Sequence, residues 1–308
     1  ENYMKVLVPV PITSTMLTSC SISEPSAGET AWVSSGTYAL GDRRILVATH
    51  KIYECVQAHS SRTTTPNLDY QYWLEYGPTN KYAAFDDLVS TQGTNTTTLQ
   101  YVFKPGFFNS IAMFGISGNT VDISIKDVTG GAVFYTNTID LQEYPLDWYD
   151  WGFGRIKDLS KIVVEGILPY PDPEVTITIN ATIGATAKCG IIAVGDMISL
   201  MGDSWGGTQN GASAEPVTYS YINRREDGTT EIVRRHSATD LQATVVMDKA
   251  NADIALEIVK SVLDQPAVWV STTDAGYTGL SVYGLGSGSL TYTSPIHTVL
   301  NLTVKGLI

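Results

Sequence analysis

Val121-Asp122-Ile123-Ser124-Ile125 alternates apolar and polar side chains at every step, and residues 175–179 and 299–304 repeat the pattern. A period of two residues places the apolar set on one face of a strand and the polar set on the other. Such strands suit an antiparallel sheet with one buried face and one solvated face. Gly and Pro punctuate the chain at short intervals, so the sequence predicts a mostly β protein.

One segment, residues 249–263, has the spacing of a helix instead. Asp248 is a suitable N-cap because its carboxylate can accept from the first free amides, and Pro266 stops the helix. Its apolar residues are expected to form one stripe: Ile254, Ala255, Ile258, Val259, Val262 and Leu263. We expect this helix to pack on a neighbouring sheet, with a partner-binding helix as the alternative.

The length of 308 residues is enough for two or three domains. Composition divides the chain into residues 1–90, 91–205 and 206–308, with a Gly-rich link at residues 202–211. We expect a small aromatic-rich β module, a central jelly-roll-like β-sandwich, and a C-terminal β-sandwich or barrel that carries the helix. The Gly and Ser residues at 284–289 indicate a hairpin loop.

The chain is acidic, with 19 Lys and Arg against 31 Asp and Glu and a formal net charge of -12. A protein that neutralises phosphates needs the opposite excess, so a nucleic-acid partner is not expected. Cys20, Cys55 and Cys189 are far apart, which fits buried thiols in a reducing cytosol and neither a disulfide framework nor a zinc site. No signal peptide and no apolar run of about 18 residues is seen, so we expect no membrane span.

The N-terminal block is rich in aromatic residues. Trp and Tyr rings stack on the apolar faces of sugars, so Trp32, Tyr53 and Trp73 are candidate contact residues for a carbohydrate or a partner. The alternative is that these rings form the core of a small module that serves as a scaffold or docking piece. His50 and His59 lie in the same block without the further ligands that a metal site needs.

Residues 30–73 contain Trp32, the turn 38–42 (YALGD), the segment 53–61 (YECVQAHSS), Pro66 and Trp73. In this order they resemble the carbohydrate-binding modules of families 5 and 12. The resemblance covers about one seventh of the chain and implies a small β module that can bind glycans.

The following segment, residues 77–86 (GPTNKYAAFD), resembles a string found in proteins associated with the tails of tailed bacteriophages. Gly77-Pro78 supplies a turn, and Asn80 can cap it through side-chain bonds to the backbone. Tyr82 and Phe85 are expected to anchor the segment in a core. The structural alternative is that the segment only seals one domain against the next.

Two further features are candidate contact surfaces. Trp148, Tyr149 and Trp151 crowd one loop of the central block, where they either plug the sandwich or face a sugar or a neighbouring subunit. Asp227-Gly228 predicts a hairpin whose two arms carry paired arginines. These are Arg224, Arg225, Arg234 and Arg235. They are expected either to contact acidic surfaces of another subunit or to form cross-strand pairs with Glu226 and Glu231.

The order of elements in the C-terminal block weakly resembles the distal-tail and tail-tube family of phage proteins, which implies a ring-forming β-sandwich with one helix. Fold alone does not give function.

Motifs of catalysis are missing: there is no nucleophile elbow, zinc-protease helix or phosphate-binding loop. Gly202-Asp203-Ser204 resembles the nucleophile block of lipase-like hydrolases, but the late Asp-x-x-His that this family needs does not precede His297. We therefore expect no enzyme activity, no catalytic residue, no metal and no cofactor.

These observations lead to one functional hypothesis and one alternative. The chain is expected to be a structural component of a bacteriophage tail tip or baseplate, a homo-oligomer that contacts other virion proteins and assembles in the host bacterial cytoplasm. The alternative is a carbohydrate-binding virion protein that contacts host surface glycans.

Overall fold

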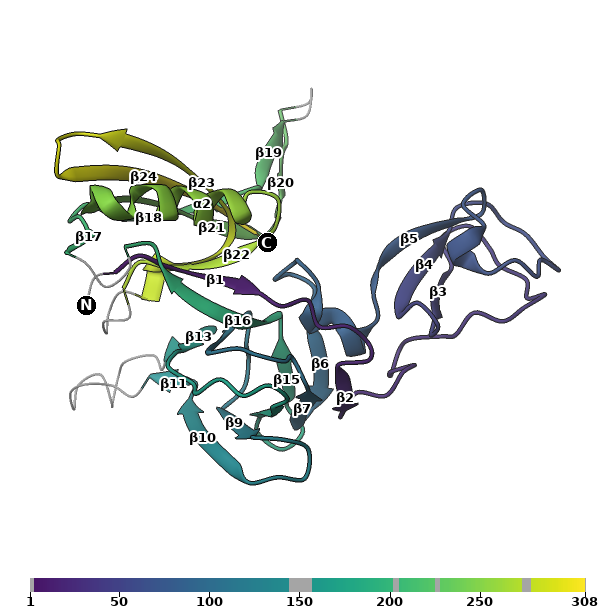
Figure 1. Ribbon diagram of the computed structural model, residues 1–308. Coiled ribbons are helices and arrows are strands. Elements are labelled where there is room, and N and C mark those ends of the chain that lie inside the picture. The colour runs from purple at the N-terminus through teal and green to yellow at the C-terminus, as the bar shows by residue number, and fades with distance from the viewer. Residues whose placement is uncertain (1–2, 144–156, 202–204, 225–227, 273–277, 308) are drawn as a thin grey trace, which may run out of the picture.

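The computed structural model describes residues 3–143, 157–201, 205–224, 228–272 and 278–307. The ladders between its named strands are antiparallel, and the prediction of a mostly β protein is confirmed. The sheets curl into a sandwich-like, half-barrel arrangement, with one α-helix among the described elements (Figure 1).

The largest sheet has ten strands and runs through both the central and the C-terminal parts of the chain. Its spatial order is β13 (Lys161–Val164), β8 (Ser110–Phe114), β16 (Ile191–Ser199), β1 (Lys5–Pro9), β22 (Ala267–Val270), β23 (Ser281–Tyr292), β24 (His297–Gly306), β21 (Ser237–Asp248) and β17 (Gly206–Thr208), and β18 (Ser213–Thr218) also pairs with β21. Because β1 lies between β16 and β22, the start of the chain joins the other two blocks. The division of the chain into three separately folding blocks stays a prediction.

A five-stranded sheet forms the second layer of the central sandwich. Its order is β10 (Val133–Asp140), β9 (Thr120–Lys126), β14 (Glu174–Asn180), β7 (Thr98–Phe103) and β2 (Leu17–Cys20). Val121, Ile123 and Ile125 of β9 are buried while their polar neighbours are partly exposed, as the period of two requires. They share one core with apolar residues of β8, β13 and β16.

Three short ladders and four 3-10 turns complete the described elements. The ladders are β11 (Gln142–Glu143) with β12 (Lys157–Asp158), β6 (Gly93–Thr96) with β15 (Thr186–Cys189), and β19 (Tyr221–Arg224) with β20 (Thr230–Val233). The turns are η1 (Pro66–Leu68), η2 (Asn80–Phe85), η3 (Lys249–Asn251) and η4 (Thr278–Leu280).

Helix α2 (Ala252–Ser261) confirms the predicted helix. The Asp248 carboxylate accepts from the Ala250 N–H at 3.0 Å, at the start of the short turn that leads into the helix. Ala255 and Val259 are buried in the core that also holds Trp269. The predicted stripe is too wide, however, because 58% of Ile254 is exposed on the outer side of the helix.

The hairpin loop predicted at residues 284–289 is wrong, because these residues lie inside β23. Their glycines allow close packing and do not mark a turn. A Cβ atom on Gly286 would lie 2.1 Å from Cζ2 of Trp269, and one on Gly284 would lie 2.0 Å from the carbonyl oxygen of Lys305. The chain turns later, between β23 and β24, where the Ser294 N–H donates to the His297 carbonyl at 3.2 Å.

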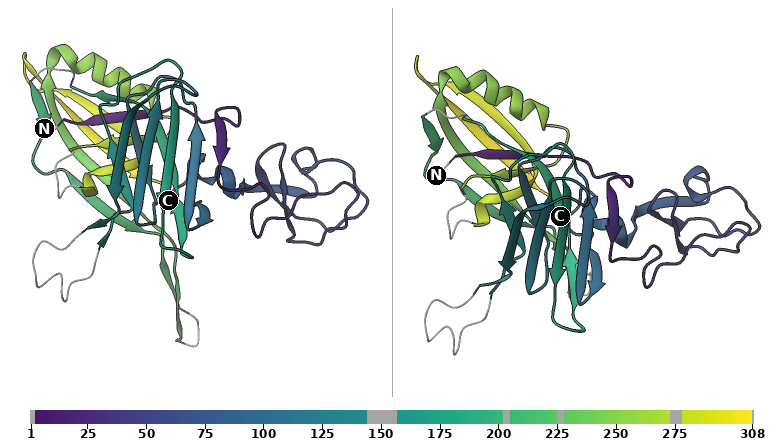
Figure 2. Two further views of the ribbon diagram at one scale, coloured as in Figure 1. Left: turned by 90° about the horizontal axis from the view of Figure 1, so that it is seen from below. Right: turned by 60° about the horizontal axis from the view of Figure 1, so that its bottom comes forward.

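A small module, residues 30–78, contains a three-stranded sheet of β3 (Arg43–Leu46), β4 (Lys51–Cys55) and β5 (Trp73–Pro78). It stands to one side of the two large sheets and is joined to them near β2 and β6 (Figures 1 and 2). The hairpin of β19 and β20 also projects beyond the sheets in both figures. These two projections carry most of the candidate contact residues.

Candidate functional site

The predicted contact aromatics of the small module are mainly its own core. Tyr53 and Trp73 are buried in a cluster with Tyr38 and Cys55. The ring of Trp73 meets that of Tyr38 nearly edge-on, with centroids 5.0 Å apart. This burial corrects the prediction for Tyr53 and Trp73, because rings closed off from solvent stabilise the module and cannot stack on a ligand. Trp32 is half-buried against the same cluster, so its contact role stays a prediction.

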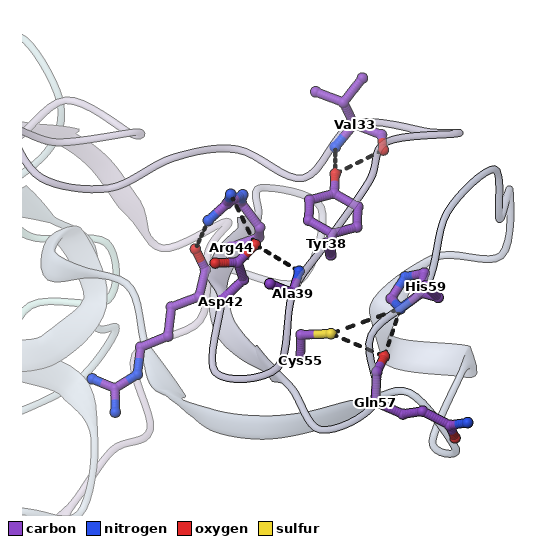
Figure 3. A network of polar contacts seen from close by, with 9 residues as sticks. Val33, Tyr38, Ala39, Asp42, Arg44, Cys55, Gln57 and His59 are labelled. Atoms are coloured by element: carbon purple, nitrogen blue, oxygen red, sulfur yellow. Dashed lines mark hydrogen bonds and ion pairs between the residues drawn. The ribbon is translucent and has the colours of Figure 1, made fainter.

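The polar residues of the same motif hold the loops of the module (Figure 3). The Tyr38 hydroxyl accepts from the Val33 N–H and donates to the Val33 carbonyl, each at 2.8 Å. The Asp42 carboxylate accepts from the N–H three residues earlier at 3.0 Å. The Cys55 thiol donates to the Gln57 carbonyl at 3.1 Å, and burial raises the pKa of this thiol. These motif residues therefore stabilise the fold of the module.

An exposed outer face of the module was missed from the sequence. We define it as Arg43, Leu74 and Tyr76. Leu74 is 63% exposed and Tyr76 is 56% exposed, and the Arg43 guanidinium lies 3.7 Å from the centre of the Tyr76 ring. Arg43 also binds Glu54 on the adjacent strand at 2.8 Å. Strand alternation away from the buried Trp73 is the signal that points to Leu74 and Tyr76.

The segment at residues 77–86 connects the small module to the sandwich. The Thr79 hydroxyl is buried and donates to Glu24 Oε1 at 2.7 Å. The Asn80 side chain accepts from the Thr94 N–H at 2.8 Å and donates to the Thr94 carbonyl at 2.9 Å. Asn80 thus bonds backbone, as predicted, but it reaches β6 and not its own turn. Phe85 packs edge-on against two aromatic rings of β7, which makes it the predicted anchor.

The arginine-bearing hairpin is a thin projection that we call the arm, residues 219–224 and 228–236. Tyr221 pairs with Val233 and Ile222 pairs with Ile232. Ile222 is 62% exposed and Ile232 is 61% exposed. At the base, the Ser220 hydroxyl accepts from the N–H of Arg235 at 2.8 Å and donates to its carbonyl at 3.1 Å. The predicted hairpin is confirmed, although Asp227 lies outside the described residues.

The arginines of the arm carry exposed positive charge. Arg224 and Arg234 are exposed, and the Arg235 guanidinium lies 5.2 Å from the centre of the Tyr221 ring. These three arginines form no ion pair with another described residue. The alternative of cross-strand pairs stays a prediction, because Glu226 lies outside the described part of the chain. Arg225 lies outside it, and the inter-subunit role of all four stays a prediction.

A proline-walled groove lies where the first strand, η2 and β22 approach one another. We define it by its apolar walls, Pro9, Val10, Pro11, Ile12, Ile191 and Pro266, and by its rim, Asp86 and Asp87. The Asp86 Oδ1 atom accepts from the Leu88 N–H at 2.9 Å, whereas Oδ2 is shielded from solvent and has no hydrogen-bond partner among the described residues. Burial raises the pKa of Asp86 to about 6.

Replacing Asp86 with asparagine is expected to stabilise the protein at pH 8 and to change little at pH 4. A carboxyl group whose pKa is raised on folding stabilises the fold most below its unfolded pKa of 3.8, and this contribution is lost as the pH rises to about 6. The shift corresponds to at most about 3 kcal/mol, and screening of a half-buried group reduces this to about 1 to 2 kcal/mol. Thermal unfolding of both proteins at low concentration across this pH range measures the gain. An equal gain at pH 4 and pH 8 would contradict the burial of Asp86.

The remaining predicted residues give no further site. Trp148, Tyr149, Trp151 and Ser204 lie outside the described residues, and their predicted roles stay predictions. Cys20, Cys55 and Cys189 are free thiols. Within the described ranges, no three His, Cys, Asp or Glu side chains are placed to share a metal ion, and no helix has the length and apolar character to cross a bilayer.

Comparison with known proteins gives only weak likeness to solved structures. No family model matches the chain, and no curated protein matches it. A solved structure that matches is a selenomethionine-labelled mutant of chitosan-binding module 1, derived from a chitosanase/glucanase of Paenibacillus sp. IK-5. It is 9% identical, the match covers 37% of this chain and 81% of the module, and the TM-score is 0.25. A likeness of this strength carries no argument about this chain.

Proposed function

We propose that this chain is a non-catalytic structural component of a bacteriophage tail tip or baseplate. In this proposal it forms a ring or a fibre adaptor through protein–protein contacts, and it joins the virion tail in the host bacterial cytoplasm. In this proposal the protein acts through surfaces that bind other proteins and not through a reactive centre.

The arm is the observation that carries this proposal. A two-stranded hairpin has no core of its own and is marginally stable in water. The arm nevertheless presents Ile222 and Ile232 to solvent as a directly paired apolar set. Exposed apolar side chains grouped with arginine and tyrosine are typical of protein–protein interfaces. A protein partner that covers this face accounts for both the apolar pair and the exposed arginines.

The segment at residues 77–86 supports the phage context through its resemblance to tail-associated proteins. It holds the small module against the sandwich through Thr79, Asn80 and Phe85. A module held in this way at the side of the body suits an adaptor that presents one face outward while the arm engages neighbouring subunits.

Negative-stain microscopy and sedimentation of the full chain test the proposal. We expect ring-shaped or chain-like oligomers of the purified protein, and detection of the chain in purified virions. A protein that is strictly monomeric and missing from virions would refute a structural tail role.

Glycan binding is the second candidate, favoured by the exposed outer face of the small module. Tyr76 is half-exposed beside Leu74 on the same strand, and an aromatic ring with an adjacent apolar group can stack on a sugar. Arg43 lies over Tyr76 and supplies donors for sugar hydroxyls.

Replacing Tyr76 with alanine is expected to remove binding to any glycan that the wild-type protein captures on an array, with a loss of at least tenfold in affinity. A tenfold loss corresponds to about 1.4 kcal/mol, which is the order of magnitude that an aromatic stacking contact contributes. Tyr70→Ala is the matched control, because Tyr70 is an exposed tyrosine of the same module outside the outer face. Glycan binding that depends on Tyr70 and not on Tyr76 would place the contact elsewhere.

A further inference from the structure

The arm has one face that combines apolar and basic groups. Ile222 and Ile232 are cross-strand partners and so point to the same side of the ribbon. Strand alternation places Arg224 on that side as well, two residues after Ile222, and Arg234 follows Ile232 at the same interval. This face of the arm is therefore an apolar pair with an arginine toward the tip and another toward the base.

The proline-walled groove has the complementary character. Its walls are apolar, and its rim carries Asp86 and Asp87, which form no ion pair with another described residue. Leu88, which is 47% exposed, is the next residue along the chain after this acidic pair. Two neighbouring carboxyl groups suit a guanidinium, because arginine binds carboxylates through charge-assisted hydrogen bonds.

The size of the groove sets what can enter it. Its cavity of about 130 Å³ is several times the roughly 30 Å³ that one water molecule occupies in the liquid. A guanidinium group fits in this space and a strand does not. An arginine can place its planar head against the two carboxylates while its methylene stem lies along the proline walls.

We infer that the arm of one copy docks at the proline-walled groove of a second copy, with an arginine of the arm inserted between the walls and the isoleucine pair resting on Leu88 and Pro11. This rests on the proposed function and adds the acceptor surface to it. The chain has 31 Asp and Glu against 19 Lys and Arg, so a second copy offers acidic surface that complements the exposed arginines of the arm.

The same arm does not fill its own groove. No arm residue lines the groove, and the arm projects away from the sheets in both ribbon views (Figures 1 and 2). A contact between two different surfaces of identical copies is heterologous, and it closes into a ring or extends as a filament. This geometry is the one that the proposed ring or adaptor requires.

Charge reversal on each surface tests the inference. Arg224→Glu with Arg234→Glu alters the arm, and Asp86→Asn with Asp87→Arg alters the groove while keeping the Oδ1 acceptor of residue 86. We expect the wild-type protein to sediment as an oligomer, and each double variant to sediment as a monomer with at least a 100-fold weaker self-association. A 1:1 mixture of the two variants should form a heterodimer and no larger species, because only one native arm and one native groove are left in each pair. Lys249→Glu with Lys260→Glu matches the charge change of the arm variant on exposed residues near α2 and should stay oligomeric.

The outcomes separate this inference from the proposed function. Assembly that returns only in the mixture requires the arm-to-groove contact, since each variant keeps one native surface. Circular dichroism of each variant checks that the fold is kept. If the groove variant does not fold, Asp87→Asn replaces it, and we expect this variant to associate about tenfold more weakly than the wild-type protein. If the groove variant stays oligomeric while the arm variant does not, the acceptor lies elsewhere and the inference fails. A wild-type monomer that is nevertheless found in virions also overturns the inference and leaves the tail role standing.

Discussion

Replacing Trp73 with alanine is expected to unfold the small module while the two large sheets stay folded. Trp73 is among the largest fully buried side chains, and it packs against Tyr38 and Cys55 in the core of the module. Loss of a buried tryptophan costs about 3 to 5 kcal/mol. A domain of about 50 residues has little stability in reserve, so this loss exceeds what the module can tolerate.

Hydrogen exchange along the chain measures the effect. Amides in residues 43–78 should lose their protection in Trp73→Ala, and those of β9 and β14 should keep it. Trp73→Phe is the matched control, because it keeps a large ring and removes an indole N–H that has no hydrogen-bond partner. If the module stays protected in Trp73→Ala and only ligand or partner binding is lost, Trp73 is a contact residue after all.

The sequence predicts the local elements of this fold better than their partners. Strict alternation at residues 121–125 and the helical spacing after Asp248 both gave correct elements, because burial of one face sets each period. The pairing of β1 joins Lys5 to Ser199 of β16 and to Val270 of β22, and no local pattern encodes contacts between residues this far apart along the chain. Gly284 and Gly286 led to the wrong prediction of a hairpin loop, because glycine is favoured both in turns and where two backbones pack closely.

The arm and the proline-walled groove also differ in how far the sequence predicts them. The arm could be predicted from Asp227-Gly228 and the flanking arginine pairs, because a hairpin is formed by residues that are close together in the sequence. The proline-walled groove collects side chains from five segments of the chain, which include Pro9, Asp86, Ile191, Pro266 and Tyr283. Each of these residues is ordinary in its own stretch of sequence. The aromatics of the small module show a further limit. Spacing suggested a contact platform at Tyr53 and Trp73, but both side chains are buried, whereas Tyr76, on the same strand as Trp73, is exposed.

Replacing both Ile222 and Ile232 with serine is expected to weaken self-association by about 100-fold to 10,000-fold, without lowering the melting temperature measured at concentrations where both proteins are dissociated. The two side chains are 62% and 61% exposed in the single chain, so they add little to its own stability. Covering an isoleucine in an interface contributes about 1.5 to 3 kcal/mol, and two of them give the stated range after ordering costs are deducted. Sedimentation equilibrium over a concentration series measures the change.

Ile254→Ser is the control for this pair, because Ile254 is 58% exposed on α2 and far along the chain from the arm. The same change of side chain at the same exposure should leave assembly intact there. The comparison matters because scattered exposed isoleucines are normal on protein surfaces and have no function by themselves. A loss of assembly in the arm variant alone would show that the two isoleucines of the arm contribute to the interface. If the arm and helix variants assemble equally well, these isoleucines are ordinary surface residues, and the proposed assembly lacks the contact that stabilises it.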